Sequence, residues 1–443
     1  MYQFSSMGKT YRPYLPEQDL LLPRSLRDWL PEEHLAYFVS DLIDELDLRA
    51  IESHYEQEER GYPPYHPRMM TKLLVYGYCV GVFSSRRLQK RLQEDVAFRV
   101  LAADNHPDFR TLSDFRQIHL STLQGLFEQV LRLALELGAL QRGRVAIDGS
   151  KLKGNASKHK AMSYKRMQDD QKRLKQEVRR LLQEAERIDA EEDARYGRNS
   201  RGDELPAELQ RREQRLQRIR EAKRALEVRA RQEAEAAAKE QDGEGSQQNV
   251  KPEEKDQYNF TDPESRILKG PDGFLQGYNT QIAVEPVLQL IVGQAVTQAA
   301  NDKKQLLPML AAVEQQAGQK PSQVLADSGY TSDASLQGVE TVKVDAYLAV
   351  ARDKHRQRPG PCPRGPLPKG ATRTDRMRRK LQTQVGRAIY AARKAIVEPV
   401  FGQIKQARGF RQFLLRGLDK VQGEWALVCM AHNVLKLHRL VRT

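Results

Sequence analysis

Apolar positions in the first 140 residues recur at helical spacing. One run begins at Leu35, a second at Met69 behind Pro67, and a third runs from Leu123 to Leu135. Spacings of three and four residues place apolar side chains on one face of a helix. We therefore predict an all-α N-terminal region over residues 1–140.

From residue 143 the pattern changes to short apolar runs bounded by turn residues, which is typical of strands. We predict strands at 143–148, 277–284, 290–296, 323–327 and 344–350. The second and third form a hairpin, a helix through residues 306–313 follows them, and the last sixty residues are helical. This order, with an insertion after the first strand, is that of an RNase H-like α/β core with a mixed sheet.

Residues 160–250 have a different composition, dense in Arg, Glu, Gln and Ala. One apolar stripe runs through Leu174, Val178 and Leu181, and another through Leu216, Ile219 and Leu226, at spacings like those of coiled-coil seams. We predict a helical hairpin inserted into the core. The expected organisation is then a helical region over 1–140, the first part of the core over 141–159, the inserted hairpin over 160–250 and the rest of the core over 251–443.

Three acidic residues lie at notable places in this pattern. Asp148 and Asp327 each end a predicted strand, and Glu398 lies in the C-terminal helical region. A carboxylate at the C-terminal tip of a strand points into the crevice where open α/β sheets place their sites. Taken singly, such a residue is more often a turn or cap residue, and Asp302 is expected to cap the next helix. Jointly, two strands and one acidic helix can converge on a pair of divalent metals, which clamp both oxygens of an in-line phosphoryl displacement.

The charge balance points to a polyanionic partner. The 443 residues carry 73 Lys plus Arg against 59 Asp plus Glu, a net charge of +14, which suits nucleic acid. The three cysteines form no CxxC pair, and their odd number argues against a disulfide scaffold. No apolar run has the length of a signal core or a membrane span. We expect a soluble, cytoplasmic protein of two or three domains.

Basic residues gather at three places. Arg86 and Arg87 follow a Ser84–Ser85 cap, and form either a recognition helix or its solvated face. The stretch 352–380 holds eleven basic and two acidic residues, among them Arg376, Arg378 and Arg379, and favours phosphate contact.

The third basic group surrounds Glu398. Lys405 follows it by seven residues, and Arg393 and Lys394 precede it by five and four. Pro399 disfavours a helix at Glu398, so we predict a kink or a fresh helix start there. The phosphate contact on this segment is assigned to Lys405 together with Arg393 or Lys394.

Five stretches in a fixed order carry a resemblance to a known family. They are Tyr65–Met69 with Ser84–Arg87, Ile147–Lys151, Gly277–Gln281, Ala326–Tyr330 and Val397–Lys405. With them the chain resembles DDE transposases of bacterial insertion sequences, and more narrowly the insertion-sequence eleven-eighty-two family. The resemblance implies an RNase H-like catalytic core, two Mg²⁺ or Mn²⁺ ions, and a catalytic and metal-binding triad of Asp148, Asp327 and Glu398.

The resemblance also implies partners and an activity. The chain is expected to cut double-stranded DNA at the terminal inverted repeats of a mobile element and join it to target DNA, as a homodimer or higher oligomer in the bacterial nucleoid. Two alternatives stay open at this point. One is an RNase H-like nuclease without strand transfer, and the other is a non-catalytic DNA-binding protein derived from a transposase.

Overall fold

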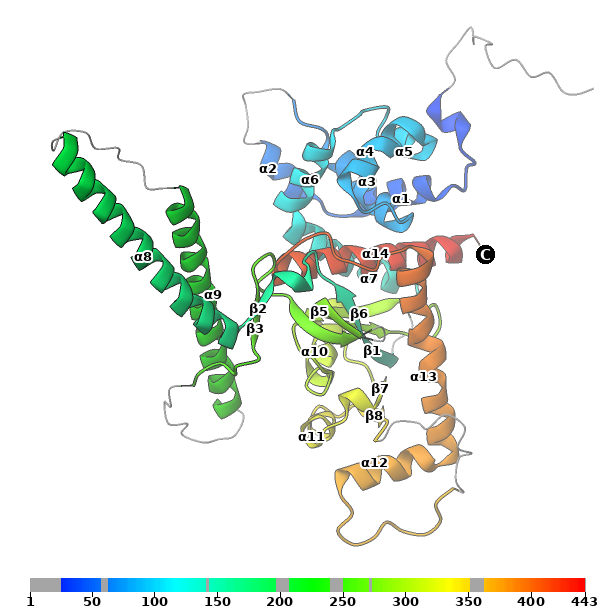
Figure 1. The fold of residues 1–443 in the computed structure, drawn as a ribbon. Helices are drawn as coiled ribbons and strands as arrows, with labels where there is room; N and C mark the ends of the chain where they lie inside the picture. Colours follow the sequence, from blue (N-terminus) through cyan, green and yellow to red (C-terminus); the bar gives the residue numbers. More distant parts are fainter. Residues whose placement is uncertain are drawn as a thin grey trace, which may run out of the picture.

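The computed structural model describes residues 25–56, 63–140, 143–196, 207–239, 250–270, 273–350 and 362–442. Figure 1 shows an N-terminal group of helices on one side of a long C-terminal helix, and a sheet on the other side. A pair of long helices projects away from the sheet.

The N-terminal region is helical, as its periodicity predicts. Its elements are η1 (Leu26–Trp29), α1 (Leu35–Glu45), α2 (Arg49–Glu56), α3 (Pro67–Cys79), α4 (Ser85–Glu94), α5 (Val96–Leu101), α6 (Phe109–Ile118) and α7 (Leu120–Glu136). The predicted apolar faces are the buried ones, for example Val39 and Ile43 on α1. Helix α3 is buried from Met69 to Cys79, except for the half-buried Lys72.

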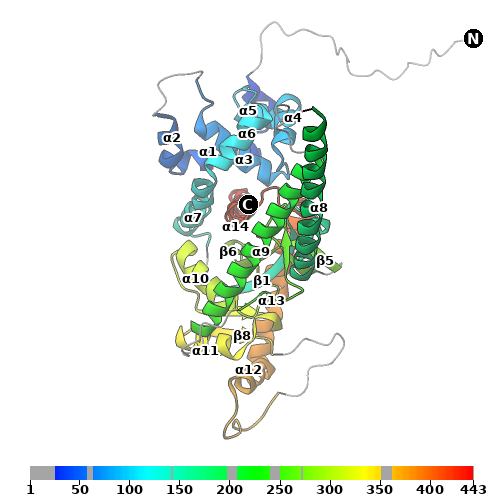
Figure 2. The same ribbon diagram turned by 60° about the vertical axis from the view of Figure 1, so that its left-hand side comes forward.

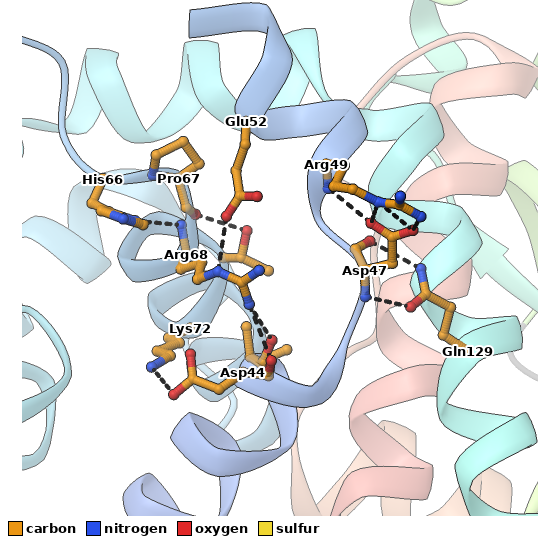
Figure 3. Close-up of polar contacts among 11 residues, drawn as sticks. Asp44, Asp47, Arg49, Glu52, His66, Pro67, Arg68, Lys72 and Gln129 are labelled. Atoms are coloured by element: carbon orange, nitrogen blue, oxygen red, sulfur yellow. Dashed lines mark hydrogen bonds and ion pairs between the residues drawn. The ribbon is translucent and has the colours of Figure 1, made fainter. Parts of the chain in front are cut away.

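Polar contacts fix the start of α3 against α1 and α2 (Figure 3). His66 caps α3 by accepting from the Arg68 backbone N–H. The Arg68 guanidinium pairs with Glu52 at 2.8 Å, and Lys72 pairs with Asp44 at 2.7 Å. Residues of the Tyr65–Met69 stretch therefore stabilise the packing of α3 against α1 and α2.

The core holds a six-stranded mixed sheet. Its strands are β1 (Arg144–Lys153), β4 (Arg266–Gly270), β5 (Gly273–Val284), β6 (Ile291–Thr297), β7 (Gln323–Ala326) and β8 (Asp345–Leu348), in the order β4-β5-β1-β7-β8 with β6 also pairing with β5. The pairs β1–β7 and β7–β8 are parallel, whereas β5 is antiparallel to β1, β4 and β6. The predicted hairpin at 277–296 is confirmed, and β4 is a strand that the periodicity did not reveal.

The prediction that the first strand ends at Asp148 is wrong. Strand β1 continues to Lys153 because β5 pairs with it from Ala146 to Lys153. Its pairing with β7 covers only Arg144–Ala146. Asp148 therefore lies in mid-strand, where β1 has lost its parallel neighbour but keeps its antiparallel one.

Helices cover the sheet and tie it to the N-terminal region. They are α10 (Leu306–Ala317), α11 (Asp333–Thr341), α12 (Arg373–Gln382), α13 (Gln384–Gly402) and α14 (Leu418–Val441), with the short turns η3 (Ser328–Tyr330) and η4 (Gln403–Ala407). Helix α14 is buried on most sides between α3, α7 and β6. Its buried Glu424 accepts hydrogen bonds from the Leu414 and Leu415 N–H groups at 3.0 Å and from the Tyr78 hydroxyl of α3 at 3.3 Å.

Of the two alternatives predicted at Pro399, a fresh helix start is wrong, and a kink stays a prediction. Helix α13 runs through Pro399 to Gly402. A proline in a helix leaves the carbonyl four residues earlier without its N–H partner. Here that carbonyl, of Ala395, accepts a hydrogen bond of 2.9 Å from the Gln289 side chain. The regular helix gives way only at Gln403–Ala407, which is a π-helical turn.

The insertion forms two long helices (Figure 2) on a small sheet, which is seen in Figure 1. The strands β2 (Ala161–Ser163) and β3 (Gln257–Asn259) pair antiparallel, and α8 (Tyr164–Tyr196) and α9 (Ala207–Lys239) extend from this stem. At 33 residues each, the helices are about 50 Å long. The insertion has a small apolar cluster of its own, separate from the main core. It consists of Tyr164, Met167, Leu174, Leu216, Ile219, Ala222 and Leu226. The turn expected between the two helices lies outside the described residues.

Candidate active site

Strand register places Asp148 beside Asp327. The parallel β1–β7 ladder runs through Ala146 opposite Leu325, and the two aspartates follow that pair by two residues each. The Asp327 carboxylate caps η3 by accepting from the Gly329 N–H at 2.8 Å, and that of Asp148 accepts from the Gly149 N–H at 2.9 Å. Each of these hydrogen bonds engages one carboxylate oxygen and leaves the other oxygen for a further partner.

A third carboxylate, that of Asp302, enters the same site. Its Oδ1 accepts hydrogen bonds from the side-chain amides of Asn279 and Gln281 on β5, both at 2.7 Å. The expectation that this side chain caps α10 is wrong, because Gln305 is the N-cap and the carboxylate points instead to β5. The sequence did not predict this position of Asp302, because the two amides that bind its carboxylate lie more than twenty residues earlier, on β5.

Close packing around Gly149 defines the floor of the site. A Cβ atom there would lie 2.5 Å from Gln281 Nε2, 3.0 Å from Asp302 Oδ1 and 3.1 Å from the Tyr330 hydroxyl oxygen. The buried Tyr330 hydroxyl donates to Gln281 Oε1. Tyr330, Gln281 and Asp302 thus form a chain of hydrogen bonds that passes directly under the residue after Asp148.

Arg393 of α13 reaches the site from the opposite side. Its Nη1 lies 3.6 Å from Asp148 Oδ2, and the side chain is 9% exposed. Its Nε and Nη1 are buried and have no hydrogen-bond acceptor among the described residues. A buried guanidinium with spare donors favours an oxyanion as an additional partner. Lys394, the other candidate, is exposed.

The surroundings raise the pKa of Asp148 to about 6. Burial is the main cause, because it disfavours the charged carboxylate. Arg393 opposes this effect, whereas the negative charges of Asp327 and Asp302 add to it. The site is therefore short of positive charge when its carboxylates are ionised.

Lys405 lies in the π-helical turn and completes the cationic side of the site. Its ammonium donates to the Ser150 hydroxyl, two residues beyond Asp148 on β1. Burial lowers the pKa of Lys405, and the charge of Asp148 opposes that effect. The π-helical turn, a feature frequent at functional sites, holds this lysine against β1.

Glu398 is not brought to the two aspartates in this arrangement. It is exposed on α13. Within the described ranges, no three His, Cys, Asp or Glu residues are grouped to hold a metal ion. The side-by-side carboxylates suit a hard divalent cation in their donor chemistry, but a third ligand from Glu398 requires movement.

The remaining basic candidates lie on two other helices. Arg86 and Arg87 are exposed on α4, and the Arg86 guanidinium lies 4.9 Å from the centre of the Phe109 ring. On α12, Arg376 is exposed, Arg378 pairs with Asp375 at 2.7 Å, and Arg379 donates to the Gly365 carbonyl. The prediction that 352–380 is a basic loop is wrong at its end, because Arg373–Gln382 forms helix α12, which Thr372 and Asp375 cap. Residues 352–361 lie outside the described part of the chain.

Two family models match the chain. Residues 24–118 match the Transposase domain (DUF772), and residues 368–438 match the Transposase DDE domain. The first covers η1 to α6 of the N-terminal region, and the second covers Arg393, Glu398 and Lys405, while Asp148 and Asp327 lie between them. No curated protein and no solved structure matches the chain. None of the described helices combines the length and apolarity needed to cross a bilayer. An N-terminal helical region, a mixed α/β sheet and these two matches together support a transposase of the DDE type.

Proposed function

We propose that this protein cuts DNA at the ends of a bacterial insertion sequence related to the insertion-sequence eleven-eighty-two family and joins those ends to target DNA. The observation that carries the proposal is the register of β1 and β7, which sets Asp148 beside Asp327 with a buried arginine 3.6 Å from Asp148. Carboxylates that can hold cations, next to cationic side chains that can hold phosphate, are the elements of phosphoryl transfer.

An RNase H-like core is part of the proposal. The strand order β6-β5-β1-β7-β8 supports it, since the first three strands are antiparallel neighbours and the last three are parallel ones. The proposed organisation keeps 1–140 as a DNA-binding region, 141–159 and 251–443 as the catalytic core, and 160–250 as an insertion that mediates self-association or spans DNA.

Asp148 and Asp327 are proposed to hold divalent cations, Mg²⁺ or Mn²⁺, with Glu398 completing the set. Such ions would neutralise charge on the reacting phosphate and favour the ionised form of Asp148. Arg393 would bind a phosphate oxygen through its spare Nε–H and Nη1–H groups. Lys405 would hold an adjacent phosphate, and the Tyr330–Gln281–Asp302 chain would fix the backbone at Gly149.

The test uses the inverted repeats that flank the reading frame as a duplex substrate. Asp148→Asn, Asp327→Asn and Glu398→Gln should each abolish metal-dependent cleavage and leave binding to the element end largely intact. Near-normal cleavage by any of these variants would remove that residue from the triad. Pre-cut ends mixed with a target plasmid test joining, because a nuclease without strand transfer leaves the two DNA molecules separate.

A further inference from the structure

A basic groove lies where β1 leaves the sheet for the stem of the hairpin. It has a volume of about 600 Å³ and is lined by 153–160, 274–276, Thr261, Gln412 and Arg416. Four of the lining residues are lysine or arginine: Lys153, Lys158, Lys160 and Arg416. No Asp or Glu lines it in the described part of the chain. Such a one-sided charge distribution attracts a polyanion.

The floor of the groove is built by hydrogen bonds between two distant segments. The Phe413 N–H donates to the Lys153 carbonyl at 2.9 Å, and the Asn155 side chain donates to the Leu414 carbonyl at 2.6 Å. The Arg416 guanidinium donates to the Asn155 carbonyl at 2.9 Å. The backbone is therefore held in place without using the lysine ammonium groups.

Those lysines stand in solvent at the edge of the groove. Lys153, Lys158 and Lys160 are exposed, and none takes part in an ion pair within the described residues. Phe274, at the tip of the β4–β5 hairpin, is 66% exposed beside them. Free ammonium groups around a preformed floor are suited to phosphates, which bind mainly through charge neutralisation and release of counterions.

Strand β1 links this groove directly to the candidate active site. Lys153 follows Asp148 by five positions on one continuous strand, a distance of about 17 Å at roughly 3.3 Å per residue. Duplex DNA rises about 3.4 Å per base pair. A duplex that follows β1 from Asp148 would therefore reach the groove about five base pairs from the phosphate at the site.

We propose that this groove binds the phosphate backbone of double-stranded DNA about five base pairs from the reacting phosphate, so that the duplex passes between the core and the stem of the hairpin. The proposal rests on the DNA-cutting function argued above and adds to it a second contact. It involves residues apart from the candidate catalytic set, which allows the two to be tested separately.

The experiment compares the full-length protein with Lys158→Ala/Lys160→Ala. A matched control, Lys320→Ala/Lys343→Ala, removes two basic side chains just before β7 and β8, outside both the groove and the proposed DNA-binding region 1–140. Affinity for an element-end duplex is measured by fluorescence anisotropy across a salt series. Loss of two phosphate contacts should reduce the slope of log K against log salt by about 1.8, at about 0.9 for each contact. The control should keep the wild-type slope.

Truncated duplexes test the position. Two duplexes are made, each shortened on one side so that it ends two base pairs from the cleaved phosphate. On the duplex that no longer reaches the groove, the groove variant and the control should have the same salt slope. A wild-type slope in the groove variant, or a difference that persists on both truncated duplexes, overturns the proposal. A reduced slope only with single-stranded DNA also overturns it. If the wild type binds duplex but cuts none of the element ends, the proposed function fails. The slopes of log K against log salt would still show whether the groove binds DNA.

Discussion

Ionisation of Asp148 should make the metal-free protein less stable as the pH rises. The pKa of this carboxyl is about 6 in the folded chain, against an ordinary value of 3.8. A folded-state pKa above the unfolded one means that the unfolded chain releases its proton first. Stability linked to Asp148 is therefore highest below pH 3.8, is lost between about 3.8 and 6, and stays at its lower level above that range.

The size of the effect follows from the difference between the two pKa values. About two pH units correspond to about 3 kcal/mol, of which about 2 kcal/mol should develop between pH 4.5 and 7.5. Asp148→Asn cannot ionise and should lack this loss. The variant loses its charge pair with Arg393, but the stability of the variant relative to the wild type should still increase by about 2 kcal/mol over this range.

The assay is urea unfolding of both proteins in EDTA, followed by circular dichroism at several pH values. Asp327→Asn is a second perturbation, because it removes a negative charge that raises the pKa of Asp148. It should shrink the pH-dependent loss. Millimolar Mg²⁺ should stabilise the wild type above pH 6 and have less effect on Asp148→Asn. The free energy of unfolding of wild type is compared with that of Asp148→Asn at each pH. If their difference stays constant from pH 4.5 to 7.5, the inference that Asp148 is desolvated and surrounded by negative charge is refuted.

Three further predictions concern packing and assembly. Gly149→Ala should cost about 1–3 kcal/mol and reduce cleavage, because its Cβ would lie 2.5 Å from Gln281 Nε2; Gly125→Ala, with nothing within 4 Å, is the control in thermal unfolding. Glu424→Ala should destabilise by about 1–3 kcal/mol for each buried donor that loses its acceptor, and Glu424→Gln should cost less in urea titrations. Replacing 165–245 with a Gly/Ser linker should leave a folded core, because β2 and β3 pair at the stem. If the hairpin mediates self-association, mass measurement should show weakened oligomers. If it spans DNA, transposition should fall while binding to one element end persists. Normal assembly and transposition would show the hairpin to be dispensable.

Local patterns in the sequence were sufficient for most helices, for most strands and for the order of the elements, but they did not predict α11 or α12. The faces of α1 and α3 and the β5–β6 hairpin follow from periodicity, which depends on residues only a few positions apart. Proximity of Asp148 and Asp327 was expected from two apolar runs that each end in an acid. The sequence signal for β4 was too weak, since that short strand is stabilised by its pairing with β5.

Tertiary contacts decided the points on which local rules failed. Pro399 is accommodated because Gln289, 110 residues earlier, satisfies the Ala395 carbonyl. The Asp302 side chain does not cap α10, because amides on β5 bind its carboxylate.

Chemistry at the candidate site was likewise set by packing. Sequence spacing left Arg393 and Lys394 as equal candidates, and the rotation of α13 buries Arg393 beside Asp148 while Lys394 stays exposed. The raised pKa of Asp148 depends on burial and on charges from three other segments. Sequence by itself therefore determined which chemical groups this protein carries and in what order. Only the folded chain decided which groups meet, because desolvation and charge act through distance in space rather than along the chain.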